Sequence, residues 1–137
     1  MPRVSVDIDL VYLPITDRQE ALAGINQSLE TISRKIQRTF SDVVISESRI
    51  ESIFLIKLII SQNEATVKIE PNQILRGSVY PAEIKELVQE AQSTFELFIS
   101  VRTLSTAELY GGKICAALDR QHPRDFFDVK VLFEHEG

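Results

Sequence analysis

"SIFLIKLIISQNEATVKIEP", residues 52–71, is the stretch that decides the fold. Two runs of strand-forming residues flank the polar turn at residues 62–65, which is the pattern of a β-hairpin. The first run is almost wholly apolar, which is typical of a central strand. It is too short to cross a membrane and it carries Lys57. The stretch therefore predicts an antiparallel strand pair at the centre of a soluble domain.

Further strands and helices are predicted on both sides of this hairpin. Apolar residues at helical spacing follow the capping-box sequence TDRQ, in which Thr16 is the predicted N-cap. A second capping box, STAE, opens another helix, and Pro123 suits the first turn of the last one. The order predicts an α/β (α+β) protein with a mixed, largely antiparallel sheet flanked by helices. Strands are predicted at residues 3–13, 42–46, 52–61, 66–71 and 95–101, and helices at residues 16–39, 81–91, 105–120 and from 123 onward.

Composition is that of one ordinary globular domain. The chain has 137 residues, of which 44% are apolar and 26% charged, which is enough for a hydrophobic core. A net charge of −5 argues against a protein that coats nucleic acid through bulk electrostatics. The single cysteine, Cys115, excludes an internal disulfide and a thiolate metal cluster, and we expect it to be a small buried residue. No signal peptide or membrane span is evident, so the expected location is the cytoplasm.

Two aspartates interrupt the first predicted strand, "VSVDIDLVYLP", residues 4–14. Asp7 and Asp9 stand at positions i and i+2, which share one face of a strand with Cα atoms roughly 6.5–7 Å apart. Carboxylates at this spacing can converge on a hard divalent cation such as Mg²⁺, which also binds substrate phosphates. The alternative is an edge strand with one solvated face, on which the acids discourage aggregation.

The second half of the hairpin carries another acid on a polar face. In "VKIEP", Lys68 and Glu70 point away from the apolar side of the strand. If this strand lies beside the first one, Glu70 can join the two aspartates as a third carboxylate. Three carboxylates and two metals would suit in-line phosphoryl or nucleotidyl transfer. The alternative is an ordinary solvated strand face.

The third candidate segment is "AELYGGKICAALDRQHPRDFFDV", residues 107–129. Gly111 and Gly112 lie inside a helical pattern, where each costs about 1 kcal/mol relative to alanine. A helix tolerates such glycines where another group approaches closely or where the helix bends. The next residue, Lys113, could meet a triphosphate as a point charge. The alternative is that Lys113 is an ordinary surface lysine. The acidic residues that follow would then interact favourably with the dipole of the next helix.

Taken together and in this order, the three segments resemble the AbiEii/AbiGii toxin nucleotidyltransferases of the DNA polymerase β-like superfamily. The resemblance covers nearly the whole chain, and its most specific part is "GGKICAALDRQHPRDFFD", residues 111–128. In the family, the paired acids and a third acid bind metal, a lysine engages the nucleotide phosphates, and a further acid belongs to the last motif. The resemblance thus implies catalytic roles for Asp7, Asp9, Glu70, Lys113 and Asp125, metal binding by Asp7, Asp9 and Glu70, and substrate contacts from Ser5, Lys68, Lys113 and Arg124.

The resemblance also implies an activity and partners. Family members transfer a nucleotide from an NTP, in some cases to the 3′ end of tRNA, with Mg²⁺ or Mn²⁺, and a separate antitoxin protein accompanies them. The superfamily places a Gly-Ser turn before the paired acids and the family continues beyond the last motif. The expected chain is therefore one trimmed nucleotidyltransferase-like core, residues 1–137, without that turn or the C-terminal helical region.

Two other functions remain open from the sequence. The first is a truncated, non-catalytic remnant that acts as a binding or oligomerisation module through an open sheet edge. The second is a D-x-D glycosyltransferase, which also holds a metal with paired acids. The second alternative leaves residues 111–128 unexplained.

Overall fold

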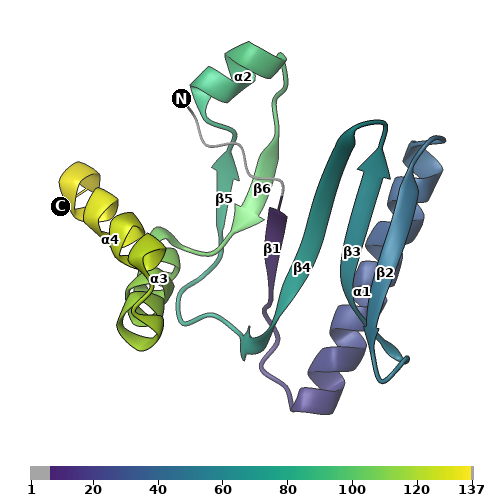
Figure 1. Ribbon diagram of the computed structural model, residues 1–137, viewed down its shortest axis with the longest axis horizontal. Helices are drawn as coiled ribbons and strands as arrows, with labels where there is room; N and C mark the ends of the chain where they lie inside the picture. Colours follow the sequence, from purple (N-terminus) through teal and green to yellow (C-terminus); the bar gives the residue numbers. More distant parts are fainter. Residues whose placement is uncertain (1–6, 137) are drawn as a thin grey trace. The chain divides into compact units, whose positions relative to one another are not determined.

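The computed structural model describes residues 7–136, which fall into two compact units, an N-terminal unit ending at Gly77 and a C-terminal unit beginning at Ser78 (Figure 1). The N-terminal unit contains β1 (Asp7–Tyr12), α1 (Arg18–Thr39), β2 (Val44–Ile50), β3 (Phe54–Gln62) and β4 (Ala65–Arg76). The C-terminal unit contains β5 (Glu83–Glu86), α2 (Gln89–Phe95), β6 (Ser100–Thr103), α3 (Thr106–Arg120) and α4 (Pro123–Glu136). The predicted mixed α/β class is confirmed.

The sheet of the N-terminal unit has the strand order β1-β4-β3-β2. The predicted hairpin is confirmed as β3 and β4, which pair antiparallel down to Gln62 and Ala65. Asn63 in the turn between them has a φ of 52°, a left-handed conformation that asparagine tolerates better than most residues. β1 pairs with β4 in parallel, whereas β2 pairs with β3 antiparallel, so the sheet is mixed.

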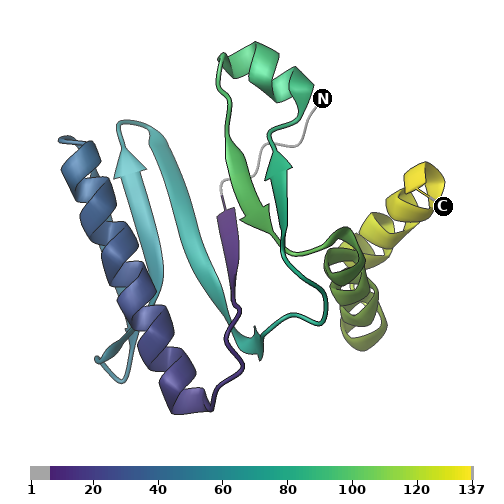
Figure 2. The same cartoon turned by 180° about the vertical axis from the view of Figure 1, so that it is seen from behind.

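Helix α1 packs on one face of this sheet (Figure 2). Its apolar stripe supplies Ile25 and Leu29, which meet Leu55 and Leu58 of β3 and Ile69 of β4 in one buried cluster. Burying such side chains contributes roughly 1.5–3 kcal/mol each. The core therefore fixes which face of the sheet is inside, and it leaves the opposite face of β1, β4 and β3 for polar side chains.

A β-bulge lets β3 bury two leucines that strict alternation would separate. The register between β2 and β3 shifts by one residue, which leaves Ile56 without a partner on β2. An extra residue of this kind bends a strand and re-aims its side chains. Leu55 and Leu58, three positions apart, are consequently both fully buried.

Asn26 of α1 provides a hydrogen-bond acceptor for a backbone amide of β3 beside the bulge. Its side-chain Oδ1 accepts a hydrogen bond from the amide of Leu55 at 2.9 Å. Buried backbone N–H groups are almost always paired, so this contact replaces a missing ladder hydrogen bond and ties the helix to the sheet.

We expect Asn26→Ala to lower the free energy of unfolding by about 1–3 kcal/mol, because the Leu55 amide is left buried without an acceptor. Gln27→Ala is the matched control, since Gln27 is an exposed neighbour on the same helix, and it should change stability by less than about 0.5 kcal/mol. Urea unfolding followed by circular dichroism measures both variants. Equal effects from the two substitutions would contradict the role of Asn26.

The C-terminal unit is held by contacts between its loops and helices. β5 and β6 pair antiparallel over four residues each. Ser105 caps α3, as predicted, by accepting a hydrogen bond from the amide of Glu108. The Glu108 carboxylate also accepts hydrogen bonds from the amides of Val79 and Tyr80 at 2.9–3.0 Å. These hydrogen bonds connect Val79 and Tyr80, near the start of the unit, to the first turn of α3.

Three local predictions are wrong. The N-cap of α1 is Asp17 rather than Thr16, because the Asp17 carboxylate accepts from the amide of Glu20 at 2.9 Å. The helix predicted at 81–91 is replaced by β5 and the short α2, since pairing with β6 overrides the helical pattern of a short segment. The strand predicted at 95–101 begins only at Ser100, after α2 has ended.

Candidate functional site

Asp7 and Asp9 lie on the face of β1 that points away from α1. Leu10 and Tyr12 of the same strand pack against the hydrophobic core, and alternation places the two aspartates on the outer side. Both aspartates are exposed. The core thus anchors β1 through its apolar side chains and presents the carboxylates on a fixed backbone.

The register between β1 and β4 places the third acid next to the pair. Asp9 is aligned with Glu70, and Asp7 is aligned with Lys68. Neighbouring strands lie about 4.8 Å apart, so the side chains of aligned residues in a parallel pair stand next to each other. The condition set by the sequence, that the VKIE strand lies beside the strand with the two aspartates, is therefore met.

Two lysines neutralise two of the three carboxylates. The Lys68 ammonium lies 3.1 Å from Asp7 Oδ1, and the Lys57 ammonium of β3 lies 3.1 Å from Glu70 Oε1. Within the described part of the chain, Asp9 has no ion-pair partner. Three carboxylates therefore stand beside two ammonium groups on this face of the described sheet, and carboxylate oxygens favour a cation.

The donor set suits a hard divalent cation, because carboxylate oxygens are the ligands that Mg²⁺ and Mn²⁺ prefer. As the side chains stand, however, residues 7–136 contain no group of three or more acidic, histidine or cysteine side chains gathered closely enough to hold a metal ion. The carboxylates of Asp7 and Glu70 are turned to their lysines instead. The residues therefore fit the metal by chemistry and by backbone placement, and a bound ion would compete with the two lysines for the carboxylates.

The predicted residues of the C-terminal unit form two ion pairs between α3 and α4. Lys113 Nζ lies 2.8 Å from Asp128 Oδ2, and Arg120 Nη2 lies 3.2 Å from Asp125 Oδ1. The Lys113 side chain is 49% exposed while that of Asp128 is 19% exposed, so the lysine retains access to solvent and ligands. These contacts join the two helices and hold Lys113 at their surface.

The other predicted residues of the last segment are open to solvent. Gly111 and Gly112 lie inside α3, and a Cβ added at either position would meet no atom of the described chain within 4 Å. Arg124 is exposed, and so is Cys115, which contradicts the prediction that this cysteine is buried. Ser5 lies outside the described residues.

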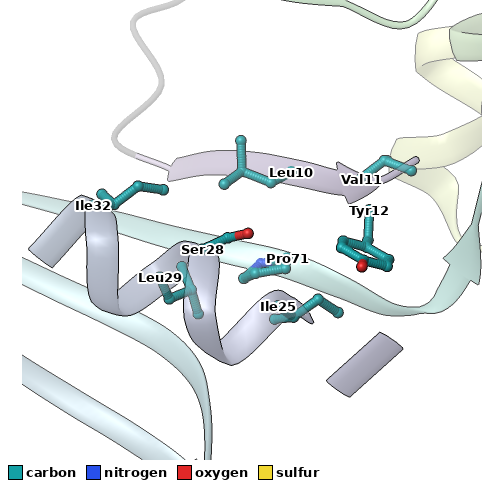
Figure 3. A pocket seen from close by; sticks show the side chains of 8 residues that line it. All are labelled: Leu10, Val11, Tyr12, Ile25, Ser28, Leu29, Ile32 and Pro71. Atoms are coloured by element: carbon teal, nitrogen blue, oxygen red, sulfur yellow. The ribbon is translucent and has the colours of Figure 1, made fainter. Parts of the chain in front are cut away.

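A small apolar pocket lies between α1 and the strands β1 and β4 (Figure 3). Its volume is about 90 Å³, whereas sites for small ligands typically measure about 300–1,000 Å³. A nucleotide does not fit in this pocket. Its lining comes from β1, α1 and β4, through Leu10, Val11, Tyr12, Ile25, Ser28, Leu29, Ile32 and Pro71.

Lys57 has no predicted role in the sequence-based site. Its signal is visible in the sequence, as one charged residue inside the apolar run "IFLIKLII" at 53–60. The ion pair with Glu70 appears only once β3 is placed next to β4.

Comparison with protein families gives a match over residues 1–137 to the family described as nucleotidyl transferase AbiEii toxin, type IV TA system. The chain belongs to this family, which confirms the resemblance and accounts for residues 111–128 where a glycosyltransferase does not. Membership of a toxin–antitoxin family implies an antitoxin as partner. Comparisons with curated proteins and with solved structures gave no match. Among the described residues, no helix has the length and apolar character needed to span a membrane.

Proposed function

We propose that the protein is a metal-dependent nucleotidyltransferase that transfers NMP from an NTP to an acceptor such as the 3′ end of tRNA. The observation that carries the proposal is the register of Asp9 with Glu70, with Asp7 two residues away on the same face. Family membership supplies the reaction class. The acidic face supplies what this reaction needs, since phosphoryl transfer depends on positioned charge more than on covalent chemistry.

Asp7, Asp9 and Glu70 would hold Mg²⁺ or Mn²⁺. When bound, the ion supplies stabilisation for the charge that develops on the phosphoryl oxygens. The chain provides rigidity, because β1 is fixed by its apolar side and β4 by pairing on both edges. Lys68 stands on the same face as the acids and contacts a phosphate of the substrate as a point charge.

Residues of the last segment contribute to the proposed activity by their match to the family motifs. Lys113 engages the triphosphate, and its half-exposed side chain beside Asp128 is accessible for this role. Asp125 serves as the acid of the last motif, with Arg124 as a substrate contact. Ser5 is assigned a further substrate contact. In this proposal residues 1–137 act as one nucleotidyltransferase-like core.

The direct test is transfer of label from each of the four α-labelled NTPs to total tRNA in the presence of Mg²⁺ or Mn²⁺. We expect transfer from at least one NTP, loss of transfer with Asp7→Ala and Lys113→Ala, and loss on addition of EDTA. A chelator should remove activity without unfolding the protein, because the hydrophobic core is independent of the acidic face. Transfer that continues in EDTA would contradict the metal. An absence of transfer from all four NTPs to tRNA and to total RNA would overturn the proposal.

A further inference from the structure

A contribution to the stability of the protein does not explain why a lysine occupies position 57 of β3. It lies in β3, which has β4 on one side and β2 on the other, so it is not a charge that protects a sheet edge. Lysine is a poor strand former among the aliphatic neighbours of this run. Its ion pair joins two partly exposed side chains, 28% and 41% exposed, and such pairs contribute little to stability.

Lys57 belongs to a row of polar residues that crosses all four strands. Asp9 is aligned with Glu70, Glu70 forms the ion pair with Lys57, and Lys57 is aligned with Ser48 of β2. The row starts with two carboxylates and continues with an ammonium and a hydroxyl. Carboxylates and hydrogen-bond donors are therefore adjacent on the same face of the sheet.

The ammonium of Lys57, which contacts Glu70 Oε1, and a divalent cation would compete for the negative charge of the same carboxylate. If Glu70 serves as a metal ligand, its attraction for Lys57 weakens, because the ion shares the carboxylate charge and the two cations repel each other. The displaced ammonium stays within reach on a rigid strand and needs a new anionic partner. Phosphate oxygens of a substrate held at the same metal provide that partner, and lysine binds them as a point charge.

We propose that Lys57 is a phosphate-binding residue that pairs with Glu70 in the free protein and with a substrate phosphate once the carboxylates hold a cation. The inference rests on the proposed function, since it requires a cation at the acidic face. The phosphate belongs either to the triphosphate of the nucleotide or to the phosphodiester backbone of the acceptor. Both carry the same chemistry, and the experiment below separates them.

The test uses the whole chain and three variants. Lys57→Met removes the charge and keeps an unbranched apolar stem that suits the strand, and Lys57→Arg keeps the charge. Lys35→Met is the matched control, because it makes the same charge change at an exposed position of α1. Thermal unfolding verifies that each variant is folded.

Two binding measurements give readouts besides activity. Electron paramagnetic resonance measures the affinity for Mn²⁺ alone. Calorimetry and filter binding then measure, in Mn²⁺, the affinities for α,β-methylene analogues of the four NTPs and for total tRNA. We expect Lys57→Met to keep or raise the affinity for Mn²⁺, because a competitor for Glu70 is gone, and to lose roughly tenfold to a hundredfold in affinity for one phosphate ligand. Lys57→Arg should retain most of that affinity.

The outcomes separate the alternatives. A loss confined to the nucleotide analogues assigns Lys57 to the triphosphate, and a loss confined to tRNA assigns it to the acceptor. If Lys57→Met weakens Mn²⁺ binding in parallel with both ligands, Lys57 only holds Glu70 in position and the inference is wrong. It is also wrong if both ligands bind as they do to the unmodified chain, or if Lys35→Met loses as much affinity. Failure of the unmodified chain to bind Mn²⁺, or Mn²⁺ binding unaffected by Asp9→Asn, would overturn the proposed function along with it.

Discussion

Replacing Asp9 by asparagine is expected to lower nucleotide transfer by about a thousandfold or more while leaving the fold intact. A catalytic metal is worth several kcal/mol of stabilisation in the transition state, and loss of a central ligand removes most of it. Asp9 is the central acid of the proposed set, because it neighbours Asp7 along β1 and Glu70 across the sheet. Label transfer to tRNA and Mn²⁺ affinity should fall together in this variant.

The same substitution is expected to leave stability unchanged or to raise it by about 0.2–1 kcal/mol. Like charges on adjacent strands destabilise a sheet, and asparagine removes the repulsion between Asp9 and Glu70. A residue that lowers stability while it serves a function is a common feature of active sites. Asp42→Asn is the control, since it makes the same change at an exposed loop position and should alter neither activity nor stability. An Asp9→Asn protein that transfers nucleotide normally, or that unfolds, would contradict the proposed role.

The N-terminal half of the fold could be predicted because its signals are local and agree with one another. The apolar run of β3, the turn after Gln62 and the alternation in β4 each require a hairpin, and the structure has one. The segment from residue 81 to 101 could not be predicted in the same way. Its strands are only four residues long, and a four-residue pattern fits a helix or a strand until its pairing partner is known.

The acidic face could be predicted only in part, because strand register is a tertiary property. Alternation placed Asp7 and Asp9 on one face, but their distance from Glu70 depended on which strand lies beside β1. A one-residue slip of β4 would have turned Glu70 into the core. The ion pair of Lys57 with Glu70 was still harder to predict from the sequence, because it depends on the position of a third strand, β3, as well.

Gly24→Ala is expected to destabilise the protein by about 1–3 kcal/mol, although alanine is the better helix former by about 1 kcal/mol. Gly24 lies in α1 directly against the ring of Tyr12. A Cβ at this position would overlap Tyr12 Oη and would lie 2.6 Å from Cζ and 2.9 Å from Cε2. The ring packs on the core and must shift to make room, and any part of that shift taken up by the Tyr12 backbone moves β1. Urea unfolding measures the loss, and a change of position of β1 should also weaken Mn²⁺ binding.

Gly112→Ala separates this steric effect from helix propensity. Gly112 is also a helical glycine, but a Cβ there meets no atom of the described residues within 4 Å, so the substitution should raise stability by about 0.5–1 kcal/mol. Tyr12→Leu combined with Gly24→Ala should cost less than the sum of the single substitutions, because the clash is absent from the double variant. If Gly24→Ala and Gly112→Ala changed stability equally, the contact with Tyr12 would not matter. If Gly112→Ala raised stability but reduced nucleotide transfer, the bare helix surface beside Lys113 would be the place where the substrate approaches α3.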